Sequence, residues 1–253
     1  MTKGASPPMM TQAAFDALLY QAFERNALLA LLTRERADRL YALTLHMLKI
    51  NESFNLTAIK DIPRIILLHY ADSLKGIDTF AEGATVVDIG CGAGFPSLPL
   101  ALFRPDLRIL AVDSTAKRVG YVAETAKMLG LDNLDTLTAR AEDLGRNPRY
   151  RERFDHATAR AVAALPILCE LCLPLVRIGG SFAAMKGKNA AEELRAAKHA
   201  IQKLGGGTPS LSDTPLWDEE GVEYAHATIV IPKKEETSAL YPRLYTKIAK
   251  APL

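Results

Sequence analysis

The chain has 253 residues, of which 49% are hydrophobic and 24% charged, and its 31 basic and 29 acidic side chains leave a formal net charge of +2. This composition predicts a soluble globular protein of one large or two small domains, and it allows nucleic acid binding only through a local basic surface. No apolar run reaches the roughly 18–20 residues of a membrane span, and the N-terminus lacks the apolar core of a secretion signal. We therefore expect a cytoplasmic protein without membrane contact.

The N-terminal part of the chain is predicted to be helical. Residues 1–10 hold two prolines and small polar side chains, and we expect them to be disordered. Apolar residues recur at helical spacing over residues 12–32, and Thr33 is placed to cap a second helix. We assign residues 11–75 to a helical extension, which either packs over a sheet or recognises a partner.

A third helix is expected from Arg64 to Leu74, after Asp61 and Pro63. His69 and Asp72 are three residues apart and therefore share one face of this helix. A histidine beside carboxylates is usually structural. Because this helix closely precedes the glycine turn described next, the alternative is that both residues border the site.

The most informative stretch is VVDIGCGAGFPSLPLAL, from Val86 to Leu102. After an apolar run that contains Asp88, three glycines occupy alternate positions: Gly90, Gly92 and Gly94. Such a turn lets a nucleotide-like ligand approach the backbone and the free N–H groups of a helix start. A dinucleotide-binding turn has its third glycine one residue later, where this chain has Phe95. The spacing therefore favours S-adenosylmethionine, which has no pyrophosphate; an ordinary strand-to-helix turn is the alternative.

From residue 85 onward, predicted strands alternate with helices, which indicates an α/β fold with a doubly wound, mostly parallel sheet. The expected strands cover residues 85–89, 108–112, 134–138, 154–159, 181–185, 225–231 and, more weakly, 209–211. Helices are expected from residue 96, over 116–129, from the fourth strand through Cys169, and over 190–204. This order matches the seven-stranded, Rossmann-like sheet of class I S-adenosylmethionine-dependent methyltransferases. We assign residues 76–234 to this domain and residues 235–253 to a basic C-terminal tail.

Ligands of open α/β sheets lie beyond the carboxyl ends of the strands, so the residues there are candidates for the site. They are Gly90 to Phe95, Asp113, Ser114, Arg140 to Glu142, Arg160 and Lys186. Asp113 is placed to hydrogen-bond a ribose hydroxyl, and Ala141 with Glu142 can bind an adenine amino group. Arg160 and Lys186 would face an anion, either the cofactor carboxylate or a substrate phosphate; surface salt bridges are the alternative.

Two basic segments are candidates for RNA contact. The stretch from Leu144 to Arg153 has four arginines around Tyr150, a pattern typical of a flexible nucleic-acid contact, and a solvated loop is the alternative. The second segment is the C-terminal tail, which either contacts phosphates or is solvated. Its basic residues are Lys233, Lys234, Arg243, Lys247 and Lys250.

The three cysteines are interpreted as packing residues. Cys169 and Cys172 form C-x-x-C within an apolar stretch, with Cys91 as the third cysteine and no histidine pair nearby. This pattern disfavours a zinc site, so we expect no metal, and buried free thiols suit a reducing compartment.

Several longer motifs together resemble one enzyme family. They are FNLTAI from Phe54, HYADSL from His69, DIGCGAGFPSLPLAL from Asp88, VDSTAKRV from Val112, ARAVAAL from Ala159, LCLPLV from Leu171 and MKG from Met185. The resemblance is to the small-subunit ribosomal RNA methyltransferase G family, also called glucose-inhibited division protein B, and it runs from about Phe15 to Lys233. It implies a methyl transfer from S-adenosylmethionine to guanine N7 in the 530 loop of 16S rRNA, giving 7-methylguanosine. The expected partner is 16S rRNA or the small ribosomal subunit, and we expect a monomer.

The resemblance also implies which residues contact the cofactor. It assigns Gly90, Phe95, Ala141, Glu142 and Arg160, and it matches Asp113 to the family's acid after the second strand. Combined with the glycine pattern, this gives one predicted cofactor-binding set. The set is Asp88, Gly90, Gly92, Gly94, Phe95, Asp113, Ser114, Ala141, Glu142 and Arg160.

The chemistry of N7 needs no catalytic base, because N7 of neutral guanine is a lone pair without a proton. We therefore expect catalysis by alignment and exclusion of water, with Arg160 and Lys186 orienting cofactor and RNA. The fourth strand ends in ATARAV rather than the N/D-P-P-Y/F that positions an exocyclic amine. Three alternatives stay open: a methyltransferase acting on a small molecule, a nucleotide-binding oxidoreductase, and a non-catalytic RNA-binding regulator.

Overall fold

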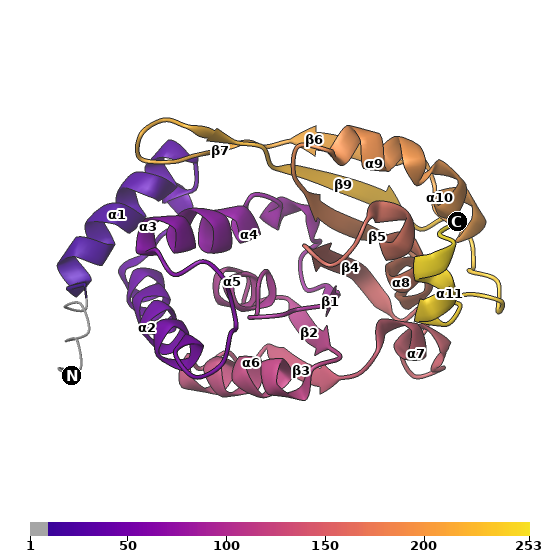
Figure 1. Ribbon diagram of the computed structural model, residues 1–253, viewed down its shortest axis with the longest axis horizontal. Coiled ribbons are helices and arrows are strands. Elements are labelled where there is room, and N and C mark those ends of the chain that lie inside the picture. The colour runs from indigo at the N-terminus through magenta and orange to yellow at the C-terminus, as the bar shows by residue number, and fades with distance from the viewer. Residues whose placement is uncertain (1–9) are drawn as a thin grey trace, which may run out of the picture.

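A seven-stranded sheet forms the centre of the computed structural model, which describes residues 10–253 (Figure 1). Its strand order is β3-β2-β1-β4-β5-β9-β6; β1 to β5 pair in parallel, and β9 is antiparallel to both β5 and β6. The strands are β1 (Thr85–Ile89), β2 (Arg108–Asp113), β3 (Leu134–Thr138), β4 (Phe154–Arg160), β5 (Val176–Lys186), β6 (Ser210–Asp213) and β9 (Ala227–Pro232). A separate hairpin pairs β7 (Leu216–Trp217) with β8 (Glu223–Tyr224). The predicted fold class, a doubly wound and mostly parallel sheet, is confirmed.

The order of the strands determines where a ligand can bind. β2 and β3 lie on one side of β1, whereas β4 and β5 lie on the other, so the chain reverses its winding direction between β1 and β4. The carboxyl ends of β1, β2 and β4 meet at this point, with Asp88 opposite Ala111 in one neighbour and Thr158 in the other. Ligands of open α/β sheets bind at such a reversal.

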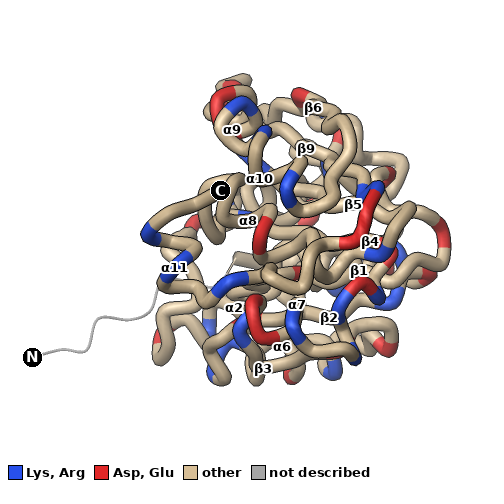
Figure 2. The backbone as a smooth tube through the Cα atoms, turned by 90° about the vertical axis from the view of Figure 1, so that its right-hand side faces the viewer, with Lys and Arg blue, Asp and Glu red and all other residues tan. Residues whose placement is uncertain are grey.

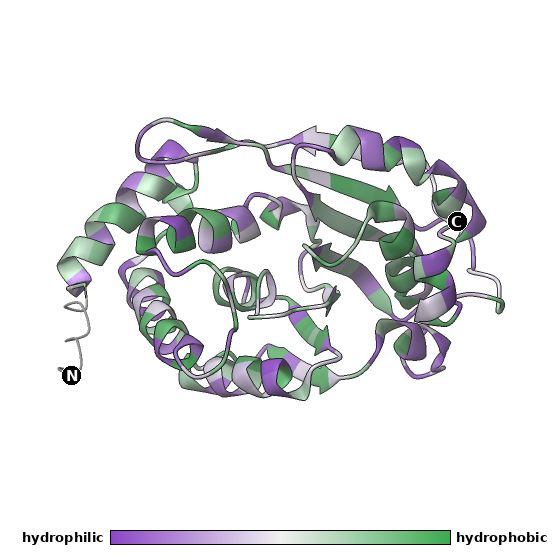
Figure 3. Ribbon diagram, viewed as in Figure 1, coloured by the Kyte–Doolittle hydropathy of each residue, from purple (hydrophilic) through white to green (hydrophobic). Residues whose placement is uncertain are grey.

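Helices cover both faces of the sheet and enclose two hydrophobic cores (Figure 1). Because side chains alternate along a strand, Val86 enters the first core and its neighbour Val87 the second. The first face carries α1 (Gln12–Arg25), α2 (Arg34–Asn51), α3 (Ile62–Ile65), a π-helix (Ile66–Ala71), α4 (Asp72–Leu74), α5 (Ser97–Phe103) and α6 (Ala116–Met128). The second carries α7 (Ala141–Arg146), α8 (Leu165–Cys172), α9 (Ala190–Ala196), α10 (Lys198–Lys203) and α11 (Tyr245–Lys250). Figure 3 shows hydrophobic residues concentrated along α8, β5 and β9.

Three predicted helices differ from the observed ones, and the one expected from Arg64 to Leu74 contains the π-helix Ile66–Ala71. The periodic segment over residues 12–32 ends as an α-helix at Arg25, because the Asn26 side chain bonds the backbone of Trp217 and Ala27 adopts a positive φ of 57°. The helix expected over 190–204 is interrupted at Ala197, a fully buried residue with ψ near zero. The cap predicted at Thr33 is confirmed, since its hydroxyl accepts a hydrogen bond from the backbone of Arg36 at 3.2 Å.

The C-terminal segment is attached to the domain, which corrects the prediction of a solvated or phosphate-binding tail for two of its basic residues. Lys233 is fully buried; its Nζ donates to the Leu173 carbonyl at 2.9 Å and pairs with Glu152 at 3.1 Å. Arg243 pairs with Glu170, a carboxylate with no exposed surface, at 2.6 Å. Both cations therefore hold the chain in place, and the buried Lys233 is unavailable to RNA.

The arginine-rich loop after α7 is also partly structural. Arg151 donates to the backbone carbonyls of Gly145 and Tyr241, each at 2.8 Å, and to that of Thr237. The loop leads to the amino end of β4, at the edge of the sheet opposite the strand ends described above. On this side of the molecule basic and acidic residues are interspersed (Figure 2). The prediction of a flexible RNA contact is therefore wrong for Arg151.

Three further findings bear on the sequence predictions. The cysteines at positions 91, 169 and 172 are buried and free, as the packing interpretation predicts, and burial raises the pKa of each thiol. No helix of the described part of the chain is long and apolar enough to cross a membrane. Nine of the ten residues predicted to be disordered, 1–9, lie outside the described residues.

Candidate active site

The glycine turn between β1 and α5 is tied to the end of β2. The backbone N–H groups of Gly90 and Cys91 both donate to the Val112 carbonyl, at 2.8 and 2.9 Å. Gly90, at φ +75°, could not carry a side chain without displacement, because a Cβ there would lie 2.5 Å from Val162 Cγ2. At Gly92 a Cβ would have room, and the requirement for glycine comes from φ +56° alone.

Asp113, at the end of β2, connects the turn to the start of α6. One carboxylate oxygen accepts from Gly92 N at 3.1 Å, and the other accepts from Thr115 N at 2.8 Å. Arg118 lies 3.7 Å from the same carboxylate. The glycine turn, the second strand and α6 are thus held in one arrangement around a single acid.

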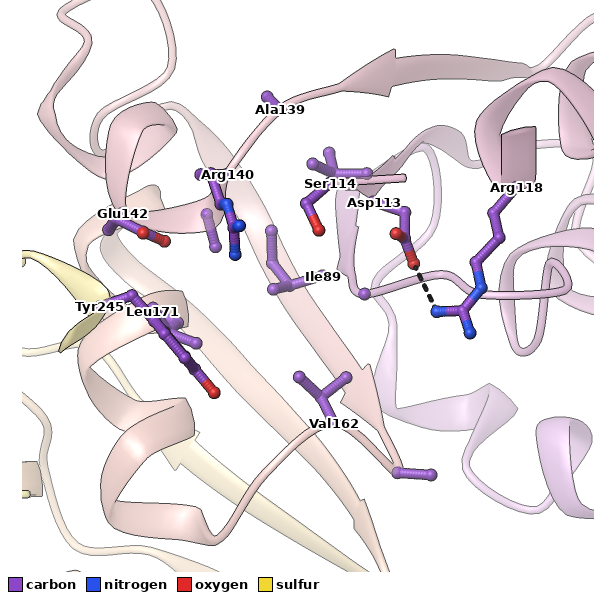
Figure 4. Close-up of a pocket in the computed structure, with 14 residues that line it drawn as sticks. Ile89, Asp113, Ser114, Arg118, Ala139, Arg140, Glu142, Val162, Leu171 and Tyr245 are labelled. Carbon is purple, nitrogen blue, oxygen red and sulfur yellow. Dashed lines mark ion pairs between the residues drawn. The ribbon is translucent and has the colours of Figure 1, made fainter. Parts of the chain in front are cut away.

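A first pocket of about 270 Å³ opens at the carboxyl ends of β1, β2, β3 and β4. Five of the predicted cofactor-binding residues line it: Gly90, Asp113, Ser114, Ala141 and Glu142. Figure 4 shows Asp113 and Arg118 at one end of the pocket and Glu142 and Tyr245 at the other. Its remaining lining residues are Ile89, Val112, Arg118, Ala139, Arg140, Ala161, Val162, Leu171 and Tyr245.

Tyr245 reaches this pocket from the C-terminal helix α11 and was not among the residues predicted from sequence. The preceding Arg243 positions α11: its Nε and Nη2 donate to Glu170 at 2.8 and 2.6 Å, and its backbone N–H donates at 2.7 Å. Ile248 of the same helix is fully buried. A signal was present, since Glu170 is the one acid in the apolar stretch ALPILCELCLPLV, and a buried carboxylate needs a cationic partner.

A second cavity, of about 660 Å³, adjoins the first and shares Ala161 and Val162 with it. Arg160 and Lys186 line this second cavity, and both are paired. Arg160 donates to the Leu68 carbonyl at 3.0 Å and pairs with Asp72, whereas Lys186 pairs with Glu193 at 2.7 Å. The other lining residues are Ile59, Leu68, His69, Asp72, Ala163, Ala164, Met185, Gly187, Glu193, Ala225 and His226.

Four further residues of the predicted cofactor-binding set, besides Arg160, lie outside the lining of the first pocket: Asp88, Gly92, Gly94 and Phe95. Phe95 packs beneath the second cavity, its ring stacked on that of His69 with centroids 4.3 Å apart. His69 and Asp72 do border a cavity at the strand ends, which is one of the two outcomes expected for them.

Asp88, in β1, is hydrogen-bonded to Ser97 of α5 and so connects the two ends of the glycine turn. It is buried, and Ser97 Oγ donates to one of its oxygens while the other has no hydrogen-bond partner within residues 10–253. Burial raises the pKa of Asp88 to about 6, partly offset by the Ser97 hydrogen bond and by the charge of Arg160.

We expect Asp88→Asn to remove a pH dependence of stability. Between its ordinary pKa of 3.8 and about 6, the folded state of the wild type holds a proton that the unfolded chain releases. The Asp88 contribution to the free energy of unfolding therefore falls as the pH rises through this range, by about 2–3 kcal/mol in total. Urea unfolding of the wild type and the variant from pH 4 to pH 7 measures the difference between their free energies of unfolding. The other titrating groups contribute equally to both proteins and cancel in this difference. Parallel curves would contradict the assignment.

Comparison with known proteins gives one family. The family model described as rRNA small subunit methyltransferase G matches residues 36–213. A protein named ribosomal RNA small subunit methyltransferase G from Lactobacillus delbrueckii subsp. bulgaricus is 43% identical over 201 residues, covering 78% of this chain and 83% of its own. A protein of the same name from Halalkalibacterium halodurans is 44% identical, and the alignment covers 80% of this chain and 85% of its own. Another, from Clostridium perfringens, is 40% identical over 80% of this chain and 84% of its own.

Solved structures share the fold at low sequence identity. An O-methyltransferase from Bacillus cereus in complex with SAH superposes with a TM-score of 0.53 at 17% identity, covering 76% of this chain and 91% of its own. The [4+2]-cyclase SpnF superposes with a TM-score of 0.52 at 14% identity, covering 80% and 96%. Because one of these two proteins is named a cyclase, the shared fold alone does not define the reaction.

Proposed function

The chain belongs to the rRNA small subunit methyltransferase G family, and from this premise we propose that it methylates guanine N7 of 16S rRNA, with S-adenosylmethionine as methyl donor. The product is 7-methylguanosine. The observation that carries the proposal is the family match over residues 36–213, together with two adjoining cavities at the winding reversal of the sheet. One cavity suits the cofactor and the other a base, and Ala161 and Val162 lie at their junction.

We propose the first pocket for the cofactor, because its residues fit an adenosine. The Asp113 carboxylate suits the ribose hydroxyls, and Ala141 with Glu142 suits the adenine. Gly90 lines the pocket without a side chain, so the methionine part can approach its backbone. Tyr245, an addition to the predicted set, covers the end of the pocket near Glu142 (Figure 4).

The mechanism that we propose for these residues is alignment without proton transfer. Held by Asp113, Ala141 and Glu142, S-adenosylmethionine would supply a methyl group on a sulfonium, which the N7 lone pair would accept with the thioether as leaving group. Burial, and secondly the charge of Arg160, lowers the pKa of His69 to about 3, so this imidazole is neutral at physiological pH and is no proton donor. Lys186, with two of its protons bonded to Ala163 and Glu193, keeps one donor to orient the RNA.

We also propose that the protein acts as a cytoplasmic monomer on rRNA or on the small ribosomal subunit. The segments 11–75 and 235–253 then serve the domain 76–234 as accessory parts: the first supplies His69 and Asp72, and the second supplies Tyr245.

The test uses small ribosomal subunits from cells that lack this protein. The subunits are incubated with the purified chain and S-adenosylmethionine, and the digested 16S rRNA is examined for 7-methylguanosine by mass spectrometry. New 7-methylguanosine at one site is the expected result, and a parallel reaction on free rRNA defines the substrate form. Cofactor binding without any new rRNA modification would contradict the proposal and favour a small-molecule substrate.

A further inference from the structure

The second cavity combines apolar walls with polar groups that have unused hydrogen-bonding capacity. Ile59, Leu68 and Met185 provide apolar surface, and the volume of about 660 Å³ lies within the usual range for small-molecule sites. Such walls suit the faces of a planar base, while specificity must come from the polar groups at its edge. The polar side chains of this cavity therefore determine whether it can distinguish guanine from other purines.

Asp72 and His226 form a polar pair with unused hydrogen-bonding capacity on the wall of this cavity. One oxygen of Asp72 is bonded to Arg160, and the other lies 3.5 Å from His226 Nε2. His226 is 4% exposed, and its Nδ1 is fixed by Thr214 Oγ1 at 2.7 Å. Its Nε2 has no hydrogen-bond partner anywhere in the part of the chain that the structure describes. The acceptor beside His226 Nε2 is this Asp72 oxygen, which no hydrogen bond among the described residues uses and which is free to accept from a ligand in the cavity.

The charge around the pair keeps Asp72 suited to accept hydrogen bonds. Arg160 holds one side of the carboxylate, and burial lowers the pKa of His226, so this imidazole stays neutral near pH 7. Lys75 also faces His226 from the adjoining helix end. Arg160 therefore fixes the carboxylate through one oxygen, and the free oxygen is an acceptor beside the neutral His226 ring at 3.5 Å.

Guanine offers a matching edge that adenine lacks. Its N1–H and its 2-amino group are adjacent donors, whereas adenine has an acceptor at N1. Methyl transfer to N7 also leaves a positive charge on the purine. A carboxylate at the N1–H edge stabilises that charge more in the transition state than in the neutral base.

We propose that Asp72, oriented by Arg160 and His226, accepts hydrogen bonds from N1–H and the 2-amino group of the target guanine and so selects guanine over other purines. This inference rests on the proposed function. It assigns Asp72 to substrate recognition and His226 to the positioning of Asp72.

The test compares guanosine with inosine, which lacks only the 2-amino group, at the target position. Small subunits are reconstituted with 16S rRNA that carries either nucleoside there, and kcat/KM is measured for each protein. The wild type is expected to prefer guanosine by about tenfold or more, the value of one good hydrogen-bonded contact to a base edge. In Asp72→Asn the ratio is expected to fall to within about threefold, because the amide no longer offers two acceptors.

Glu193→Gln is the matched control, since it makes the same change from carboxylate to amide in the same cavity. Its rate can fall, because Glu193 holds Lys186, but its guanosine-to-inosine ratio should equal that of the wild type. The ratio is taken within one protein preparation, so a partly destabilised variant remains informative. If Asp72→Asn does not fold, His226→Asn replaces it, and the ratio should then fall at least threefold.

Each outcome separates this inference from the proposed function. If the wild type forms no 7-methylguanosine, the proposed function fails. If it methylates guanosine and inosine equally well, or if Asp72→Asn keeps the wild-type ratio, the function stands and the role of Asp72 is wrong. If Glu193→Gln loses the guanosine-to-inosine preference and Asp72→Asn keeps it, Glu193 recognises the 2-amino group and the inference is overturned.

Discussion

Replacing Gly90 with Ala is expected to lower the affinity for S-adenosylmethionine at least about 100-fold, the equivalent of roughly 3 kcal/mol. A left-handed backbone at φ +75° costs a residue with a Cβ roughly 1–2 kcal/mol. The new Cβ would also lie 2.5 Å from Val162 Cγ2, so Val162 must move from its position between the two cavities. Isothermal titration calorimetry with S-adenosylmethionine measures the loss.

Gly83→Ala separates backbone strain from the effect on the site. Gly83 has nearly the same φ, +69°, but its Cβ would meet no atom within 4 Å, and it lies before β1, at the opposite end of that strand from the glycine turn. This variant should lose comparable stability and keep its cofactor affinity. Adding Val162→Ala to Gly90→Ala should restore part of the affinity if the collision is responsible. Binding by Gly90→Ala within threefold of the wild type would remove Gly90 from the cofactor site.

The elements that could be predicted from sequence are those determined by residues close to one another in the chain. Strands β1 and β3 have the predicted bounds, and β1 shows the reason, because an apolar run between turn residues marks a buried strand. The glycine turn could be recognised from its three alternate glycines. The structure gives the reason for them: each has a positive φ, which few other residue types adopt. From the strand order, Asp113 and Glu142 could then be assigned to the same edge of the sheet, where both line the first pocket.

The parts that were missed depend on contacts between distant residues. Arg243 and Glu170 are 73 residues apart, and Arg151 reaches the Thr237 carbonyl over 86 residues. Composition alone presents Arg151 and Lys233 as surface charges, and only the packed chain shows their carbonyl and carboxylate partners. His226 illustrates the same limit, because it lies far in sequence from Asp72 and no motif connects the two.

Replacing Arg243 with Ala is expected to cost about 3–5 kcal/mol of unfolding free energy, because it leaves the Glu170 carboxylate buried without its cation. The change should also weaken binding of S-adenosylmethionine, since Arg243 fixes the start of α11 and thereby Tyr245. Urea unfolding measures the first effect and calorimetry the second. Arg39→Ala is the control that shows whether burial of the carboxylate causes the loss. It breaks the exposed contact with Glu35 on the surface of α2 and should lower the free energy of unfolding by less than about 1 kcal/mol.

The double variant Glu170→Leu/Arg243→Leu distinguishes the two roles of this ion pair. Replacing both charges with apolar side chains removes the unpaired carboxylate, so most of the stability lost in Arg243→Ala should return. The backbone N–H of Arg243 nevertheless loses its acceptor on Glu170, and α11 loses that attachment. We therefore expect a double variant that is nearly as stable as the wild type but binds the cofactor more weakly. If instead Arg243→Ala is no less stable than Arg39→Ala, or if the double variant regains full cofactor affinity, the ion pair does not hold Tyr245 at the pocket.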